Sequence, residues 1–297
     1  MKVSEAIDFF MSAKEAEGIS PNTVRSYNEK LWRFCKWAGD PDISAISVPL
    51  IRSYIAHLQP QMRAVSVASY IRPIKVFCRF LEAEELTGPN PFRRVKVPAF
   101  EKKLHDIISD EDFRTLLNAC NLREHEGRRN AAILCFLVDT GVRVSEMCNL
   151  KRDDLDIKGR WARIFGKGGK ERIVFFSAQT AIALTRYLSK MPARYRSEYV
   201  FTSMRRNVGG RMTPWGVGQM LQRLKERTGV QSRVNPHTFR HTFATNYLRS
   251  GGDLNSLMRL MGHADLTILQ NYLALANEDL KVKHDQYSPL NLVMGGK

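Results

Sequence analysis

A short segment in the last third of the chain, residues 235–241, places two histidines and an arginine at helical spacing. Its opening Asn and Pro are typical of a helix start, so His237, Arg240 and His241 are predicted to share one face. Phe239 lies on roughly the opposite face and can pack against a core. Two histidines four residues apart could bind a metal ion, but no Glu lies between them as in the HExxH pattern, and Arg240 would repel a cation. The segment therefore indicates either a cationic face that points into a cleft or a solvated basic surface.

Two further cationic side chains lie earlier in the chain. Arg143 closely follows residues 131–138, a nearly unbroken apolar run that is predicted to be a buried helix. It lies at a turn, with Glu146 one helical turn beyond, so it could bind an anion or simply pair with Glu146. Lys167 lies in a glycine-rich segment, where small residues permit either close approach to a phosphate or a tight turn.

His263 and Tyr272 complete the set near the end of the chain. Gly262 is typical of a helix stop, His263 follows it directly, and Tyr272 lies on a fresh predicted helix. A tyrosine at helical spacing is commonly a half-buried amphipathic side chain, so Tyr272 taken alone indicates no chemistry.

The order of these residues along the chain resembles that of the tyrosine recombinase (phage integrase) family, most closely its Xer-like members. The resemblance also covers the front of the chain, where Ser20, Pro21, Asn22, Thr23 and Tyr27 look like the opening of the family's core-binding domain. The matching pieces in the rear part are TGVRVSE at 140–146, GKGGKER at 166–172, PHTFRHTFAT at 236–245, and MGH at 261–263 with Tyr272 downstream.

The resemblance implies a catalytic role for six residues: Arg143, Lys167, His237, Arg240, His263 and Tyr272. The transition state of a phosphodiester gathers negative charge on its equatorial oxygens, which two rigid guanidiniums can stabilise. By resemblance, Tyr272 is the nucleophile and Lys167 is the general acid that protonates the leaving 5′ hydroxyl. His263 would donate a hydrogen bond to a nonbridging oxygen, and His237 would assist proton transfer or charge stabilisation. Glu146 matches an acidic position that supports the site.

A phenolic nucleophile forms a covalent 3′-phosphotyrosyl intermediate that keeps the energy of the broken phosphodiester. A second DNA hydroxyl can then reseal the strand without ATP. Because the cationic cluster takes the part that divalent metals take in two-metal nucleases, we expect no metal and no other cofactor.

Amphipathic helices fill the front of the chain, from Val3 to about Leu86. Ser20 and Ser47 are predicted N-caps, and a third helix is expected over residues 65–83. Gly88-Pro89-Asn90-Pro91 then stops helical structure. With the resemblance, residues 1–92 are predicted to form a helical, SAM-like core-binding domain that binds DNA.

Residues 93–105 are basic, contain proline and have little pattern, so they are the predicted interdomain linker. Residues 106–297 are predicted to form the catalytic domain, with a helix start at Ser109 and two short strands at 161–165 and 172–176. Helical patterning resumes at Ser177 and continues, with breaks, to about Asp285. The predicted fold is mainly α with a small antiparallel β-sheet, in the two-domain tyrosine recombinase architecture.

The charge of the chain indicates a polyanionic partner. It carries 46 Lys and Arg against 30 Asp and Glu, a net +16, and its 43% hydrophobic residues suffice for packed cores. Residues 1–100 hold 14 Lys and Arg against 10 Asp and Glu, so +12 falls on the rear part. No apolar run approaches the roughly 20 residues of a membrane span, and no signal peptide is evident, so we expect a cytoplasmic, nucleoid-associated protein. The five scattered cysteines are predicted to be reduced core residues.

By resemblance, the partners are double-stranded DNA and further copies of the chain. The expected assembly is a tetrameric synapse on DNA, formed from free monomers or together with a related recombinase. Residues 277–292 could dock on a neighbouring copy or pack within their own chain.

Three other functions compete with this prediction. A type IB topoisomerase uses similar residues to relax DNA, although the compact length and the Xer-like front domain argue against it. A non-catalytic DNA-binding regulator would be expected to have lost Tyr272 or an arginine. A metal-dependent nuclease would need ligands such as Asp153, Asp154 and Asp156, which are more simply a solvated turn.

Overall fold

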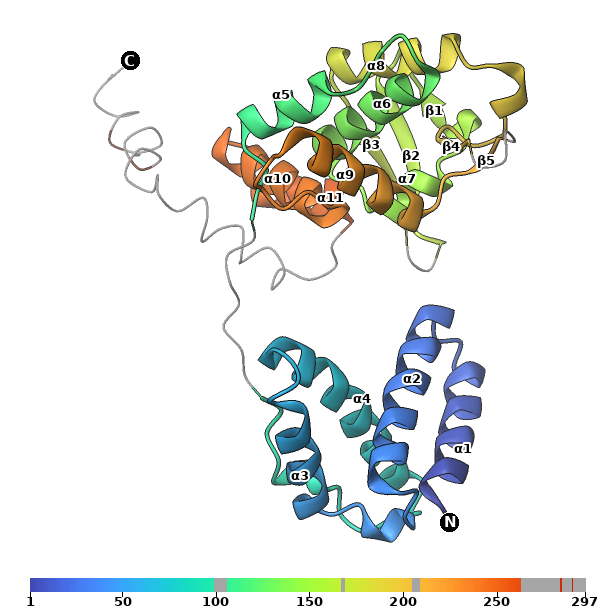
Figure 1. Ribbon diagram of the computed structural model, residues 1–297, viewed down its shortest axis with the longest axis vertical. Helices are drawn as coiled ribbons and strands as arrows, with labels where there is room; N and C mark the ends of the chain where they lie inside the picture. Colours follow the sequence, from blue (N-terminus) through green and yellow to red (C-terminus); the bar gives the residue numbers. More distant parts are fainter. Residues whose placement is uncertain (99–105, 167–168, 205–208, 263–283, 285–289, 291–297) are drawn as a thin grey trace. The chain divides into compact units, whose positions relative to one another are not determined.

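The computed structural model describes residues 1–98, 106–166, 169–204, 209–262, 284 and 290. The chain divides into two compact units, Met1–Lys103 and Leu104–Lys297. Helices make up most of the described residues, and the strands are short and antiparallel (Figure 1). The predicted fold class, mainly α with a small antiparallel sheet, is confirmed.

Four α-helices build the described part of the first unit: α1 (Val3–Ala16), α2 (Pro21–Ala38), α3 (Val48–Leu58) and α4 (Ala64–Ala83). The predicted helix signals are confirmed. The Ser20 hydroxyl accepts a hydrogen bond from the Thr23 backbone N–H at 3.3 Å, and Pro21 occupies the first helical position. Gly39 ends α2 with a φ of +76°, a conformation that favours glycine. Ser47 caps α3.

The core of the first unit is aromatic. Phe10, Phe34, Tyr54 and Phe77 are fully buried, and the Phe10 and Phe77 rings meet edge to face with centroids 5.5 Å apart. Helix α4 packs against α1, α2 and α3. Val95 also belongs to this core, so the packed residues of the unit continue beyond its last helix.

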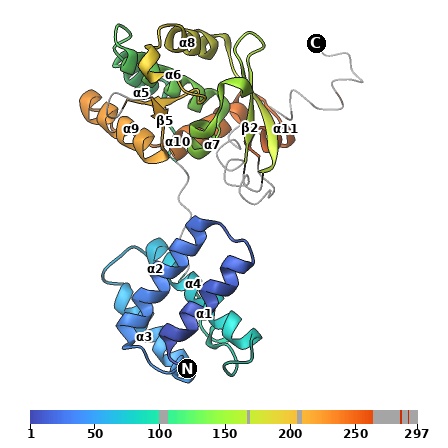
Figure 2. The same ribbon diagram turned by 90° about the vertical axis from the view of Figure 1, so that its right-hand side faces the viewer.

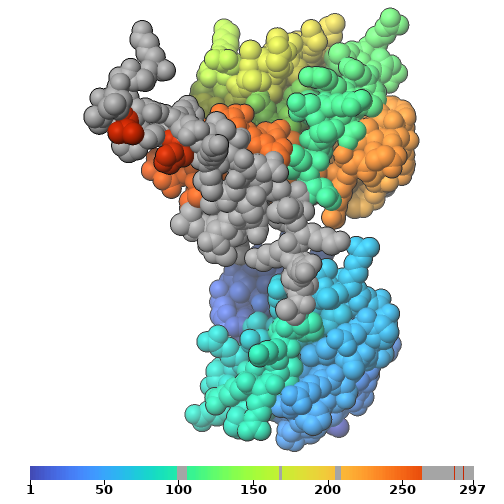
Figure 3. All heavy atoms as spheres, turned by 90° about the vertical axis from the view of Figure 1, so that its left-hand side faces the viewer, coloured from blue at the N-terminus to red at the C-terminus, as the bar shows by residue number. Residues whose placement is uncertain are grey.

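Seven α-helices lie in the described part of the second unit: α5 (Asp110–Asn118), α6 (His125–Thr140), α7 (Val144–Asn149), α8 (Ala178–Ser189), α9 (Pro214–Thr228), α10 (Pro236–Arg249) and α11 (Leu254–Met261). The buried helix predicted over residues 131–138 is confirmed as part of α6, which packs against α8, α10 and strand β3 of the sheet described below. The predicted start at Ser109 is confirmed as the N-cap of α5. The space-filling view shows α5, in green, beside α9, in orange (Figure 3).

The second unit also contains a three-stranded antiparallel sheet. Its strands are β1 (Leu155–Asp156), β2 (Trp161–Phe165) and β3 (Glu171–Phe175), and they lie side by side in the sheet in the same order as in the chain. The two strands predicted at 161–165 and 172–176 correspond to β2 and β3, which pair as an antiparallel hairpin with Trp161 opposite Phe175. Strand β3 lies beside α11 (Figure 2). A second pair, β4 (Thr202–Ser203) with β5 (Gly210–Arg211), and strand β1 were missed by the sequence analysis. Two-residue strands are too short to display a period of two.

The sequence predicts that the cysteines are reduced core residues. All five cysteines are unpaired, and four of them are buried. Burial raises the pKa of Cys78 and of Cys148 to about 12, so both thiols stay protonated near neutral pH.

Among the described ranges, no helix has the length and apolarity needed to cross a membrane.

Candidate active site

The turn between α6 and α7 places Arg143. Gly141 ends α6 with a φ of +59°, and a Cβ on it would lie 2.2 Å from Cδ1 of Phe243, so only glycine fits. Arg143 is the N-cap residue of α7. Its backbone N–H donates to Oε2 of Glu146 at 2.9 Å, and its Nη1 donates to Oε1 at 2.9 Å. The Arg143 side chain remains 41% exposed, which leaves the guanidinium accessible to a ligand.

Glu146 lies at the centre of this cluster with its side chain 5% exposed. It accepts hydrogen bonds from Arg143 and also from Arg172, whose Nη2 lies 2.7 Å from Oε2 and whose Nη1 lies 3.2 Å from Oε1. Burial by itself raises the pKa of Glu146, but the hydrogen bonds from Arg172 and Arg143 outweigh burial and hold the pKa below its ordinary value. The carboxylate is therefore ionised at neutral pH and orients both guanidiniums.

Sequence reasoning gave Arg172 no role, although its side chain connects the sheet to α11. It lies on β3, and its Nε donates to the backbone carbonyl oxygen of Leu260 at 2.8 Å. A signal for it was present in the sequence. In the alternation along this strand, Arg172 falls on the same face as the buried Val174 and Phe176. A cation on the inward face of a strand needs a buried partner.

The second arginine of the predicted site, Arg240, comes from α10. The helix starts as predicted, with the Asn235 side chain accepting hydrogen bonds from the backbone N–H groups of His237 and Thr238. Arg240 is only 6% exposed, which differs from a solvated basic surface. Its Nη1 donates to the carbonyl oxygen of Gly141 at 2.5 Å, and its Nη2 donates to that of Met261 at 2.7 Å.

These contacts form a closed ring of interactions, which we call the arginine ring. It consists of Arg143, Glu146, Arg172, Arg240, the carbonyls of Leu260 and Met261, and the carbonyl of Gly141. The carbonyls at a helix C-terminus have no partner within the helix and carry partial negative charge. Two guanidiniums from different elements satisfy them at the end of α11.

Of the other four predicted catalytic residues, the structure describes only His237. His237 is exposed in the first turn of α10, on the same helix as Arg240. Lys167, His263 and Tyr272 lie outside the described residues. The described residues that flank Lys167 are informative, because the Gly166 backbone N–H donates to the Lys170 carbonyl at 2.8 Å and closes the base of the hairpin.

The chain positions next to Lys167 and His263 both adjoin the arginine ring. A Cβ on Gly166 would lie 3.6 Å from Oε1 of Glu146. Gly262 ends α11 with a φ of +63°, and a Cβ there would lie 3.2 Å from Nη1 of Arg172. The predicted helix stop at Gly262 is thus confirmed, and His263 follows it directly in the chain.

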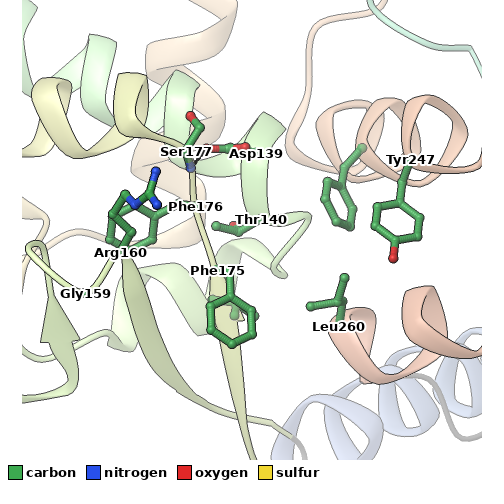
Figure 4. A pocket seen from close by; sticks show the side chains of 11 residues that line it. Asp139, Thr140, Gly159, Arg160, Phe175, Phe176, Ser177, Tyr247 and Leu260 are labelled. Atoms are coloured by element: carbon green, nitrogen blue, oxygen red, sulfur yellow. Dashed lines mark hydrogen bonds between the residues drawn. The ribbon is translucent and has the colours of Figure 1, made fainter. Parts of the chain in front are cut away.

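A cavity of about 430 Å³ lies next to the arginine ring. Its lining comes from the end of α6, from the turn before β2, from β3, from α10 and from α11, and it includes the side chains of Phe175, Tyr247 and Leu260 (Figure 4). Leu260 belongs to both features, because its side chain lines the cavity and its carbonyl accepts from Arg172. The lining does not include Arg143, Glu146 or Arg240, so this cavity is separate from the candidate phosphate-binding groups.

Two of the three aspartates considered as metal ligands, Asp154 and Asp156, have other partners. Oδ1 of Asp154 accepts from Nε of Arg163 at 2.9 Å, and Oδ1 of Asp156 accepts from the Gly159 backbone N–H at 2.8 Å. Among the residues that the structure describes, no group of three or more His, Cys, Asp or Glu side chains is arranged to hold a metal ion.

Comparison with known families identifies both parts of the chain. Residues 107–279 match the model of the phage integrase family, and residues 7–85 match the model of the phage integrase N-terminal SAM-like domain. The chain belongs to the phage integrase family. Two curated relatives support this. A tyrosine recombinase XerC of Myxococcus xanthus is 32% identical, and the match covers 93% of this chain and 94% of that protein. A tyrosine recombinase XerD of Oceanobacillus iheyensis is also 32% identical, and the match covers 95% of this chain and 97% of that protein.

Solved structures of a recombinase and of an integrase have a similar fold. The XerA recombinase crystal structure is 27% identical, with a TM-score of 0.53, and covers 96% of this chain and 99% of its own. A lambda integrase tetramer bound to a Holliday junction is 18% identical, with a TM-score of 0.74, and covers 92% of this chain and 77% of its own. With relatives named as tyrosine recombinases over nearly its whole length, the chain is a site-specific recombinase enzyme.

Proposed function

We propose that this phage integrase family member cleaves and rejoins double-stranded DNA through a covalent bond between Tyr272 and a 3′ phosphate. The observation that carries the proposal is the arginine ring. It fixes two guanidiniums, those of Arg143 and Arg240, by hydrogen bonds to one buried carboxylate and to backbone carbonyls. Such preorganised donors stabilise the charge that develops on a phosphoryl group as it is transferred.

The other roles follow from the matched positions in the sequence. Tyr272 attacks the phosphorus, and the 5′ oxygen leaves with a proton from Lys167. His263 donates a hydrogen bond to a nonbridging oxygen, and His237 assists proton transfer or charge stabilisation. In the reverse step a 5′ hydroxyl from the second DNA site attacks the phosphotyrosine and releases the Tyr272 phenol. The energy of the original bond is kept, so the reaction needs neither ATP nor a metal ion.

The DNA would be bound by both parts of the chain, with residues 1–92 as the core-binding domain, 93–105 as the linker and 106–297 as the catalytic domain. On the first unit a basic group lies between α2 and α4. Nζ of Lys30 donates to the Ser69 hydroxyl at 2.9 Å, and the Arg33 guanidinium lies over the Tyr70 ring at 4.9 Å from its centroid. These cations suit contacts with DNA phosphates.

We further propose that recombination takes place in a tetramer on two DNA sites, as in the lambda integrase tetramer bound to a Holliday junction. The free protein would be a monomer, and a related recombinase could supply half of the tetramer. Residues 277–292, which lie mostly outside the described residues, are the candidate segment for docking between copies. The protein would act in the cytoplasm, at the nucleoid.

The proposal is tested by trapping the covalent intermediate. The wild type, Tyr272→Phe and the control Tyr247→Phe are incubated in EDTA with nicked duplexes taken from the DNA that flanks the gene, and run on a denaturing gel. Tyr247 is a suitable control because it is a tyrosine of the same unit that lines the neighbouring cavity instead of the arginine ring. We expect an adduct with the wild type and with Tyr247→Phe, and none with Tyr272→Phe.

Other outcomes would favour the competing functions. An adduct with Tyr272→Phe would place the nucleophile elsewhere. Sequence-specific binding without an adduct from any of the proteins would favour a non-catalytic regulator. Relaxation of a supercoiled plasmid that lacks the site would favour a type IB topoisomerase.

A further inference from the structure

Arg172 has no role in the proposed chemistry, yet it makes three of the hydrogen bonds in the arginine ring. Its side chain is 12% exposed. Nη1 and Nη2 bind the two carboxylate oxygens of Glu146, and Nε binds the carbonyl of Leu260. One planar guanidinium therefore joins three elements: β3, on which it lies, α7 and the C-terminus of α11.

We propose that Arg172 is a positioning residue that sets the spacing between Arg143 and Arg240. On one side it fixes Glu146, the carboxylate that orients Arg143. On the other it holds the end of α11, where the next carbonyl, that of Met261, orients Arg240. The inference rests on the proposed function, because it assigns Arg172 to the same phosphate-binding site.

The geometry requires a guanidinium at this position. Binding both carboxylate oxygens and a backbone carbonyl at once takes three N–H groups in one plane, which Arg has and the single ammonium of Lys does not. The surroundings are also tight, since a Cβ on Gly262 would lie 3.2 to 3.3 Å from three atoms of the Arg172 side chain. A change at Arg172 would therefore alter where α11 ends relative to Glu146.

A loss of this positioning should slow catalysis with little effect on DNA binding. Misplacing a reacting group by about 1 Å can reduce a rate about a hundredfold. Arg172 is itself largely buried and engaged, so its removal takes away few direct contacts with DNA. The expected signature is a low single-turnover cleavage rate together with an unchanged dissociation constant.

The test compares four full-length proteins: the wild type, Arg172→Ala, Arg172→Lys and the control Arg163→Ala. Arg163 lies in the same hairpin and also pairs with a carboxylate, that of Asp154, so its removal takes away an ion pair as well. It lies on β2, whereas the strand that packs against α11 is β3. The measurements are amide hydrogen exchange of residues 254–262, the dissociation constant for a nicked duplex that the wild type cleaves, and the single-turnover rate of adduct formation.

For Arg172→Ala we expect exchange in residues 254–262 to be at least about tenfold faster, adduct formation about a hundredfold slower, and DNA affinity within about threefold of the wild type. Arg172→Lys keeps the positive charge beside Glu146 and guards against a failure of Arg172→Ala to fold. It should also show fast exchange and slow cleavage, whereas Arg163→Ala should resemble the wild type in residues 254–262.

Three results would overturn the inference. They are unchanged exchange of residues 254–262 in both Arg172 variants, full cleavage activity of Arg172→Lys, and a loss of DNA affinity that accounts for the slower cleavage. If the wild type forms no adduct on any nicked duplex, the proposed function fails, and the exchange measurement still tells whether Arg172 holds the end of α11.

Discussion

Arg172 binds both carboxylate oxygens of Glu146, at 2.7 and 3.2 Å, although the two residues are 26 positions apart in the chain. Arg143, which lies three positions before Glu146 in the chain, binds the same carboxylate. The negative charge of Glu146 is thus shared between two cations in a largely buried environment. This arrangement holds the positive charge of the arginines in place at the proposed phosphate-binding site.

Removing the Glu146 carboxylate should destabilise the second unit. Glu146→Ala leaves Arg172 with a side chain 12% exposed and without its ionic partner, and breaking a buried pair in this way typically costs about 3 to 5 kcal/mol. Glu171→Ala, which removes an exposed carboxylate from the same strand as Arg172, should stay within about 0.5 kcal/mol of the wild type. Urea denaturation measures both. Equal midpoints for the two variants would contradict the role given to Glu146.

Two glycines that end helices should differ in their tolerance of a methyl group. Gly141 and Gly229 have similar φ values, +59° and +69°, so alanine at either position carries the same backbone strain, about 1 kcal/mol. A Cβ at Gly141 would also meet the Phe243 ring at 2.2 Å, whereas a Cβ at Gly229 meets no atom within 4 Å. We expect Gly141→Ala to lower the unfolding free energy more than Gly229→Ala by at least about 1 kcal/mol. A larger loss in Gly229→Ala would count against the close packing of Phe243 on this turn.

Stability should fall as the pH drops below about 6.5 because of His125. Its ring lies between Tyr187 and Tyr195, with centroids 5.1 and 5.5 Å away, and neither ring nitrogen has a hydrogen-bond partner among the described residues. Burial, and then the nearby charges of Arg128 and Arg129, lower the pKa of His125 from its ordinary 6.5.

The sign of the effect follows from proton uptake. The unfolded imidazole binds a proton near pH 6.5, while the folded one resists protonation until a lower pH, so the contribution is complete above pH 6.5 and is lost below it. His125→Phe keeps an aromatic ring between the tyrosines and removes the titration. We expect the melting temperature of the wild type to drop more steeply than that of His125→Phe between pH 7.5 and 5.5. Parallel curves would show that another group causes the acid sensitivity.

Arg33 should contribute to the salt dependence of DNA binding. Each phosphate contact that is lost reduces the slope of log affinity against log salt by about 1. We expect this change in Arg33→Ala, measured by fluorescence anisotropy with a short duplex. Lys14→Ala removes the same charge from a side chain that is already paired with Glu17 at 2.5 Å, so its slope should match the wild type. A greater effect of Lys14→Ala would move the DNA-binding surface away from α2 and α4.

Much of the fold could be predicted from local chemistry. Ser20, Ser47 and Ser109 start helices because their hydroxyls satisfy free backbone N–H groups, and Gly39 and Gly262 end helices because they adopt positive φ. These effects act within a few residues, so a single sequence carries them. The two-residue strands β1, β4 and β5 depend on partners elsewhere in the chain and leave no such local signal.

Only part of the candidate site could be predicted from the sequence. Arg143, Glu146 and Arg240 were singled out, and the structure brings them together, while the placement of Lys167, His263 and Tyr272 stays a prediction. Two features depend on long-range contacts that spacing cannot reveal. One is the bond from Arg240 to the Gly141 carbonyl, across 99 positions, and the other is the bond from Arg172 to the Leu260 carbonyl, across 88.

The most direct test of the central claim is to map the covalent bond to DNA. The adduct formed on a nicked duplex in EDTA is digested with trypsin and nuclease, and the peptide that carries the residual nucleotide is sequenced by mass spectrometry. We predict a 3′-phosphotyrosyl linkage on Tyr272. A nucleotide attached to any other residue, or through a 5′ phosphate, would contradict the proposed mechanism.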